Sequence, residues 1–185
     1  MLHRRSMLIA GAAVAIAGCS STADPAQASA KRREIDTQVD SAMGGLFTSA
    51  PGARAVANAA EAVLVFPEVL TAGLVVGGSH GNGALRKGNT TLGYYSLSSG
   101  SVGLLAGAQT RTLYVFFMTP EALGRFQQSD GWTMGGDASV AVVDAGAMAR
   151  LDKGNSPTII GLVRNQQGFM ANLSLDGTKI SRLKI

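Results

Sequence analysis

The chain is poor in cysteine. Cys19 is the single cysteine among 185 residues. A disulfide needs two cysteines, and a zinc site built on thiolates needs several, so neither can form within this chain. A domain folded from this sequence must therefore be stabilised by its hydrophobic core, and Cys19 itself needs another explanation.

Charge is also scarce. Charged residues make up 15% of the chain and aromatic residues 5%, whereas glycine contributes 24 residues. Low charge and abundant glycine argue against a long helical bundle. The formal net charge of +4 falls to +2 if Arg4 and Arg5 are removed with a leader, because 14 basic residues then face 12 acidic ones. This weak bias does not favour nucleic-acid binding, which needs a clustered basic face.

Constellations of catalytic or metal-ligating residues are missing. The chain has two histidines, His3 and His80, and it contains no P-loop and no G-x-G-x-x-G sequence. Gly77–Gly81 formally matches the G-x-S-x-G nucleophile elbow, which requires a strand, a turn and a helix. Here Gly81-Asn82-Gly83 and an extended run follow, so we expect a glycine-rich hairpin with Ser79 and His80 non-catalytic. We predict that the protein is not an enzyme and needs no cofactor or metal.

What the chain does have is an N-terminal segment with the features of an export signal. Arg4 and Arg5 give it a positive start, Met7–Ile16 is an apolar stretch of ten residues, and two small residues precede Cys19. An apolar stretch of about 7–15 residues fits a cleaved signal, whereas a spanning helix needs about 20. Ile16-Ala17-Gly18-Cys19 therefore indicates a lipobox, in which Cys19 is acylated, palmitate included, and becomes the mature N-terminus.

Localisation follows from this interpretation. We expect a lipoprotein of the bacterial cell envelope, and Ser20 after the cysteine resembles the signal for sorting to the outer membrane, facing the periplasm. Arg4-Arg5-Ser6-Met7-Leu8-Ile9 also resembles a twin-arginine signal, so the export route stays open. The alternatives are an ordinary secretory signal with a chance cysteine and an uncleaved membrane anchor.

The sequence after Cys19 predicts a tether and then one domain. We assign residues 1–18 to the signal peptide, 19–30 to the lipidated N-terminus and a flexible tether of small polar residues, and 31–185 to the folded domain. Lys31-Arg32-Arg33 is the one dense basic cluster. It is either a solvated helix start or a contact for anionic lipid headgroups, to which Arg86 and Lys87 would add if they share its face.

Helical periodicity predicts a first helix over Lys31–Thr48. Its apolar stripe either docks on a sheet or inserts into lipid, and it comprises Ile35, Val39, Met43, Leu46 and Phe47. A short helix is expected over Gly52–Ala60, with Val56 and Ala60 facing inward, and another is expected after Thr119-Pro120-Glu121, with Leu123 and Phe126 facing the core. Trp132 is expected to pack in the core or at its rim rather than to form a ligand platform.

Short apolar runs separated by glycine-containing turns predict the strands. The first run, Ala62–Phe66, is expected to end at Pro67. Turns are expected at Gly81-Asn82-Gly83, Lys87-Gly88-Asn89, Ser99-Gly100 and Asp176-Gly177, the last in a C-terminal hairpin. The further strands are expected at Thr71–Gly77, Ala84–Lys87, Thr91–Leu97, Ser101–Thr110, Leu113–Met118, Thr133–Val143, Thr158–Val163, Phe169–Leu175 and Lys179–Ile185. The predicted class is α+β, an antiparallel β-sandwich or barrel-like sheet with two N-terminal helices and one inserted helix.

Several segments carry a resemblance to a known family. They are Ala62–Pro67, Ala72-Gly73 with Gly77-Gly78, Gly81-x-Gly83, Gly93–Ser96, Ser101–Gly103 with Gly107–Gln109, Phe117–Thr119 with Ala122-Leu123 and Phe126, Gly131-Trp132, Asp137–Val140 and Leu175–Ile180. In this order they resemble the SYLF lipid-binding domain family, over nearly the whole chain after the leader. Family members in fungi and animals are implicated in phosphoinositide binding and, in some, actin binding, and bacterial members place a single domain behind an export signal.

Two functional classes follow. In the first, the protein is anchored to the membrane through acylated Cys19 and its domain binds anionic phospholipid. In the second, it is a scaffolding lipoprotein that binds another envelope protein or an envelope polymer. The first predicts affinity that rises with anionic lipid and falls with salt.

We predict that Cys19→Ala moves the protein from the membrane fraction to the soluble fraction of the producing cells. Each buried CH₂ of an acyl chain contributes about 0.8 kcal/mol to membrane binding, so loss of the chains removes durable anchoring. Fractionation followed by a high-salt wash of the membranes measures this. A Cys19→Ala protein that still sediments entirely with washed membranes would contradict the lipobox.

Overall fold

The structure is a computed structural model that describes residues 24–73, 76–102, 107–151, 156–166, 168–170 and 175–185. The expected signal peptide and lipobox, with Cys19, lie outside these residues. Four helices occur in the described part: α1 (Pro25–Ser49), α2 (Pro51–Ala59), α3 (Pro120–Gln128) and α4 (Ala145–Met148). The strands are β1 (Ala62–Gly73), β2 (Val76–Lys87), β3 (Thr90–Val102), β4 (Gly107–Phe117), β5 (Trp132–Thr133), β6 (Ala141–Val143), β7 (Ile159–Asn165), β8 (Gly168–Met170) and β9 (Lys179–Arg182).

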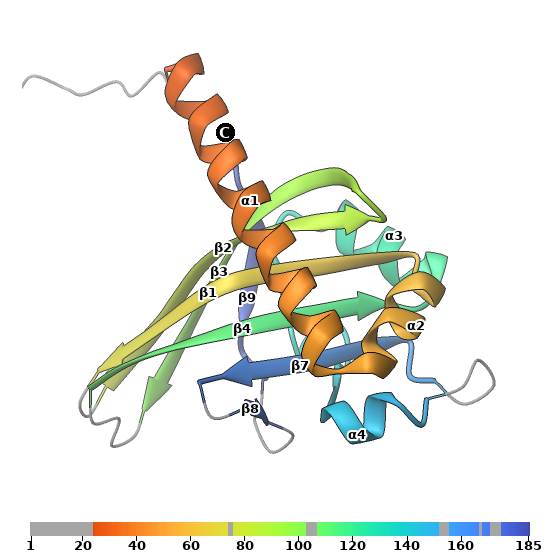
Figure 1. Ribbon diagram of the computed structural model, residues 1–185. Helices are drawn as coiled ribbons and strands as arrows, with labels where there is room; N and C mark the ends of the chain where they lie inside the picture. The colour runs from red at the N-terminus through yellow and green to blue at the C-terminus, as the bar shows by residue number, and fades with distance from the viewer. Residues whose placement is uncertain (1–23, 74–75, 103–106, 152–155, 167, 171–174) are drawn as a thin grey trace, which may run out of the picture.

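All the described strands belong to one curled sheet (Figure 1). Their order is β5-β9-β3-β2-β1-β4-β7-β6, with β8 paired to β7. Every pairing is antiparallel except that of β6 with β7, which is parallel. The predicted α+β class, with two N-terminal helices and an inserted helix α3, is confirmed. The short helix α4 was not predicted.

Strand β1 lies at the centre of the sheet and supports a core on each face. Val63 and Val65 belong to the core under α1, α2 and α4. Leu64 and Phe66 alternate with them and belong to the opposite core, which includes Phe126 of α3. The uninterrupted apolar run therefore reflects a strand that is covered on both sides, as predicted.

Pro67 does not end this strand, contrary to prediction. The register of β1 shifts between Phe66 and Val69 against β4, and between Val65 and Glu68 against β2. Proline has no N–H to donate, and it is tolerated inside a sheet where a bulge interrupts the ladder. Of the predicted strand Thr71–Gly77, Thr71–Gly73 form the end of β1 and Val76-Gly77 the start of β2, while residues 74–75 lie outside the described residues.

The turn predicted at Gly81-Asn82-Gly83 is wrong, because these residues lie inside β2 and pair with β3. Gly83 is needed there for close approach: a Cβ atom would lie 2.1 Å from the carbonyl oxygen of Val65. The turn predicted at Ser99-Gly100 is also wrong, since both residues lie within β3. The turn at Lys87-Gly88-Asn89 is confirmed and joins β2 to β3, with Gly88 at φ +58°.

The turn predicted at Asp176-Gly177 is confirmed, whereas residues 171–174 of the strand expected before it lie outside the described residues. Gly177 has the expected positive φ of +76°, and Thr178 N–H donates to the Leu175 carbonyl at 3.1 Å. However, β9 pairs with β3 and β5, while β8 pairs with β7. The strand predicted at Thr133–Val143 is divided between β5 and β6. A local glycine turn identifies a reversal but not the strand that pairs with it.

Helix α1 begins at Pro25, six residues before its predicted start at Lys31. The Asp24 carboxylate caps it by accepting from Ala26 N–H at 2.9 Å, and Pro25 occupies the first turn. Aspartate is among the preferred N-caps and proline is preferred at the first helical position. Residues 25–30 are therefore helical and do not belong to the predicted tether.

We predict that Gly83→Ala lowers the free energy of unfolding by about 1–3 kcal/mol, because the added methyl group has no space between β2 and β1. Gly100→Ala is the matched control, since it lies in β3 and a Cβ there meets nothing within 4 Å. It should leave stability equal or slightly raised. Urea unfolding of both variants measures the difference, and equal midpoints would contradict the close approach at Gly83.

Candidate functional site

The basic cluster Lys31-Arg32-Arg33 lies in the part of α1 that projects beyond the edge of the sheet (Figure 1). Arg32 and Arg33 are exposed and Lys31 is half-buried. Lys31 Nζ lies 3.1 Å from Glu34 Oε2 in a pair that solvent reaches on both sides. Such an exposed pair contributes only about 0–1 kcal/mol, so Lys31 can exchange this partner at little cost.

Arg32 contacts the C-terminal end of the chain. Its guanidinium donates to the backbone oxygen of Ile185. The preceding segment follows β9, and Leu183 N–H donates to the Tyr94 carbonyl at 2.9 Å. Lys184, which is exposed, therefore lies near the basic cluster. Sequence analysis missed Lys184, because only the pairing of β9 with β3 places it there.

Arg86 was predicted to add to this basic surface, but its side chain is 10% exposed. Its Nη2 lies 2.6 Å from Asp40 Oδ1 and 3.5 Å from Asp36 Oδ1, and it also donates to the Asp36 carbonyl. Nη1 donates to the Asn89 carbonyl at 3.0 Å. Two carboxylates of α1 already neutralise this cation, so burial and pairing argue against contact with a headgroup. Arg86 instead joins α1 to β2.

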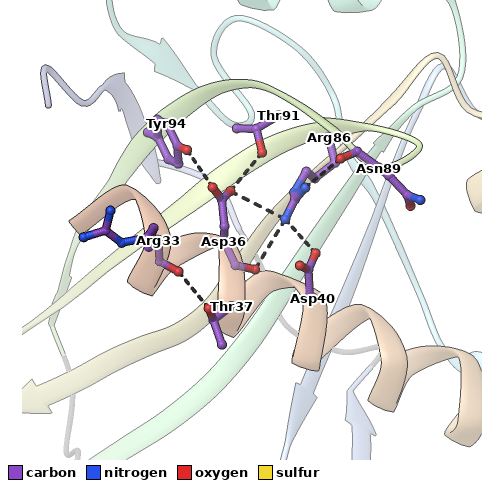
Figure 2. Close-up of polar contacts among 8 residues, drawn as sticks. All are labelled: Arg33, Asp36, Thr37, Asp40, Arg86, Asn89, Thr91 and Tyr94. Carbon is purple, nitrogen blue, oxygen red and sulfur yellow. Dashed lines mark hydrogen bonds and ion pairs between the residues drawn. The ribbon is translucent and has the colours of Figure 1, made fainter. Parts of the chain in front are cut away.

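Asp36 is the centre of this network (Figure 2). Its Oδ1 accepts from Thr91 Oγ1 at 2.8 Å and its Oδ2 accepts from Tyr94 Oη at 2.8 Å. Burial and the hydrogen bond to Asp36 raise the pKa of Tyr94. In the same view the Arg33 side chain is directed away from these contacts. The network therefore fixes the middle of α1 while leaving Arg33 available to solvent.

Lys87 stays at the surface, where its Nζ lies 3.2 Å from Glu61 Oε2. This ion pair connects β2 to the start of β1, and both side chains are exposed to a large extent. Lys87 is thus accessible, as a headgroup contact requires, but it belongs to a different local pair from the basic cluster.

The apolar stripe of α1 docks on the sheet. Ile35, Val39 and Leu46 are buried in the core beneath the helix, and Met43 and Phe47 pack against it while half-buried. This confirms the docked interpretation rather than insertion of the stripe into lipid. No helix in the described ranges is both long and apolar enough to cross a bilayer.

A hydrogen bond from β4 also holds α1. Tyr114 Oη donates to the Ala42 carbonyl at 2.9 Å, and burial raises the pKa of Tyr114 to about 12. The folded state therefore binds this phenolic proton more tightly than the unfolded chain does. The resulting stability is present below the ordinary tyrosine pKa of about 10 and is lost as pH rises towards 12.

Ser79 and His80 are not arranged as a nucleophile elbow. Both lie inside β2, with no helix after them, so the expected hairpin is wrong. Ser79 is buried and its Oγ lies 2.8 Å from Thr71 Oγ1, while His80 is exposed on the other side of the strand. Within the described residues, no group of three or more His, Cys, Asp or Glu is placed to hold a metal ion.

The predicted packing role of Trp132 is confirmed. The side chain is buried in the core beside α3, where its ring lies 5.4 Å from Phe126 and 6.1 Å from Phe117 between centroids. Phe126 is buried as predicted, and Leu123 packs against the same core. Thr119 caps α3 by accepting from Ala122 N–H at 3.2 Å.

Fold and surface together define an α+β domain that presents a basic helix start. A protein-family model described as Ysc84, Las17-binding protein actin regulator, matches residues 98–184. Residues 98–184 are thus similar to the Ysc84/SYLF family of binding domains, which confirms the resemblance noted in the sequence. The match begins near the end of β3, so α1 and its basic cluster lie before it. A comparison with curated proteins finds no match.

We predict that Asp36→Ala destabilises the domain more than Asp40→Ala. Both carboxylates contact Arg86, and Asp40 is closer, but its side chain is 71% exposed against 32% for Asp36. Asp36→Ala also removes the acceptor of Thr91 and Tyr94, which costs about 1–3 kcal/mol. The Asp40 pair contributes about 0–1 kcal/mol.

The two variants are matched, because each replaces aspartate by alanine inside the same helix and so changes helix propensity equally. Urea unfolding midpoints give the comparison. Equal destabilisation, or a larger loss for Asp40→Ala, would show that Asp36 is not the centre of the network.

Proposed function

We propose that this protein is a lipid-anchored envelope protein, in the outer membrane and facing the periplasm, whose domain binds anionic phospholipid. The family supports a binding role, and the SYLF family is associated with lipid binding. The leader and lipobox pattern of residues 1–19 supports the anchor. The observation that carries the proposal is that α1 is divided between a docked half and a projecting, basic half (Figure 1).

The position of the cluster suits contact with the leaflet that would hold Cys19. Residues 20–24 would separate the acylated cysteine from α1. A flexible chain of that length spans roughly 11–13 Å on average, at about 5–6 Å × √n. The cluster lies about 10 Å further along the helix, at 1.5 Å per residue. The acyl chains would therefore keep Lys31, Arg32 and Arg33 within reach of headgroups.

Electrostatic attraction would supply the affinity of the domain for the membrane. A basic side chain near an anionic surface contributes about 1 kcal/mol, so three of them contribute roughly 3 kcal/mol, a factor of about 100 in partitioning. Lys184 extends the same surface, whereas Arg86 is already neutralised by Asp36 and Asp40. Salt weakens such contacts, because charges separated by more than about 10 Å are largely screened at 0.1 M.

The test uses protein without residues 1–18 and with Cys19→Ala, sedimented with phosphatidylglycerol-containing vesicles and with neutral vesicles at low and high salt. We predict that replacing Lys31, Arg32 and Arg33 together with Gln weakens binding to anionic vesicles by roughly 10–100-fold. The matched control replaces Arg125, Arg150 and Lys179, which are exposed elsewhere, with Gln. It has the same net charge and should bind nearly as the unmodified protein does.

Two outcomes would contradict this proposal. Equal weakening by the two triple variants would mean that only the net charge of the protein matters. Absence of binding by the unmodified protein at low salt would favour the scaffolding alternative. The family description names a Las17-binding protein, so a protein partner is the alternative that the comparisons favour.

A further inference from the structure

A second polar site lies on the face of the sheet opposite α1. Its cavity has a volume of about 50 Å³. Its lining combines apolar residues, among them Val69, Leu97 and Leu113, with the polar residues Ser79, Ser99, Arg111 and Thr178. Small-molecule sites commonly measure about 300–1,000 Å³ and combine an apolar lining with a few converging polar groups. At about 50 Å³ this cavity lies well below that range, so it can admit only a compact group.

Arg111 is the cation of this pocket. It is half-buried on β4, and its Nη2 donates to Thr71 Oγ1 at 2.7 Å and approaches Ser79 Oγ at 3.4 Å. In the described ranges no aspartate or glutamate lines the pocket, and no carboxylate forms an ion pair with Arg111. Burial lowers the pKa of Arg111, but a guanidinium remains protonated at neutral pH.

The two hydroxyls beside Arg111 can donate as well as accept. Thr71 Oγ1 and Ser79 Oγ are 2.8 Å apart, so one of them donates to the other. Whichever donates, the second hydroxyl keeps its hydrogen for another acceptor. The pocket therefore offers the remaining guanidinium N–H groups and one O–H, which are all donors.

Arg86 is a useful comparison, because it is a structural cation whose charge is balanced by carboxylates. Arg86 is paired with Asp36 and Asp40 on the opposite face. Within the described ranges Arg111 has neutral partners only, although taking a charge out of water is costly unless the charge is paired. Its surroundings therefore favour an anion as a further partner.

We infer that the pocket at Arg111, Thr71 and Ser79 is a binding site for a compact oxyanion, with a phosphate group as its ligand chemistry. The fork of guanidinium N–H groups matches two phosphate oxygens, and such charge-assisted bonds are stronger than neutral ones. A cavity of about 50 Å³ is too small for an acyl chain, so only a compact charged group could enter it. The site lies on strands away from the basic cluster of α1, so it does not depend on the membrane contact proposed above.

The test measures unfolding of the purified full-length protein, in detergent, with rising inorganic phosphate and with chloride at matched ionic strength. Phosphate should raise the unfolding midpoint of the unmodified protein beyond the effect of chloride, because a ligand that binds the folded state stabilises it. Arg111→Gln should lose this response, with affinity for phosphate at least about tenfold lower. Arg150→Gln removes the same charge from an exposed position and should keep the full response.

Two further measurements ensure that the result can be interpreted. Arg111→Gln should fold with equal or higher stability when phosphate is absent, because it removes an unpaired, half-buried charge. If this variant fails to fold, amide chemical shifts of the unmodified protein test the site instead. Phosphate should then shift the signals of Thr71, Ser79 and Arg111. A response equal in all variants, shifts confined to another surface, or no response to phosphate at all would overturn the inference.

The source of the phosphate group is distinguished by the ligand used. Stronger stabilisation by a soluble short-chain phosphatidic acid than by inorganic phosphate would identify a lipid headgroup, and the reverse would identify the free ion. The Lys31, Arg32 and Arg33 triple variant should keep its response to inorganic phosphate. Failure of vesicle binding therefore leaves this site intact, and failure of the phosphate response leaves the membrane proposal intact.

Discussion

Burial of β1 on both faces is the constraint on which the rest of the structure depends. Val63 and Val65 form the floor of the core beneath α1, and Leu64 and Phe66 form the floor of the opposite core. Because the side chains of β1 alternate between the two cores, a register shift of one residue would move each of them to the opposite face of the sheet. The bulge at Pro67 changes the register only beyond this segment, so both cores stay intact while β1 continues to Gly73.

The surface proposed to meet the membrane follows from this arrangement. The sheet holds the apolar stripe of α1, and the Asp36–Arg86 contact connects the helix to β2. With its middle fixed, α1 presents Arg32 and Arg33 beyond the sheet without needing its apolar residues for membrane contact. The same two-faced sheet gives Arg111 its different surroundings, since the carboxylates of α1 lie on the other face.

Local patterns predicted most of this fold, and long-range pairing accounts for the misses. The periodicity of Ile35, Val39 and Leu46 was sufficient to predict an amphipathic helix, and Thr119-Pro120 was sufficient to predict the start of α3. Gly83 was misassigned to a turn because its sequence does not reveal the Val65 carbonyl beside it. The sequence did not reveal that Arg86 pairs with Asp40, 46 residues away, or that the C-terminal segment with Lys184 lies beside Arg32, because both contacts are long-range. Arg111 lies in no recognisable sequence motif, so the sequence did not single it out.

Hydrogen exchange along α1 tests the central claim most directly, because it compares the projecting and docked halves of one helix. In free protein, amides around Lys31–Arg33 should exchange faster than those around Val39–Leu46, whose side chains pack in the core. Adding anionic vesicles should slow exchange in the first segment and leave the second unchanged. Unchanged exchange near Lys31–Arg33 with clearly bound protein, or protection that appears only on another surface, would contradict the account.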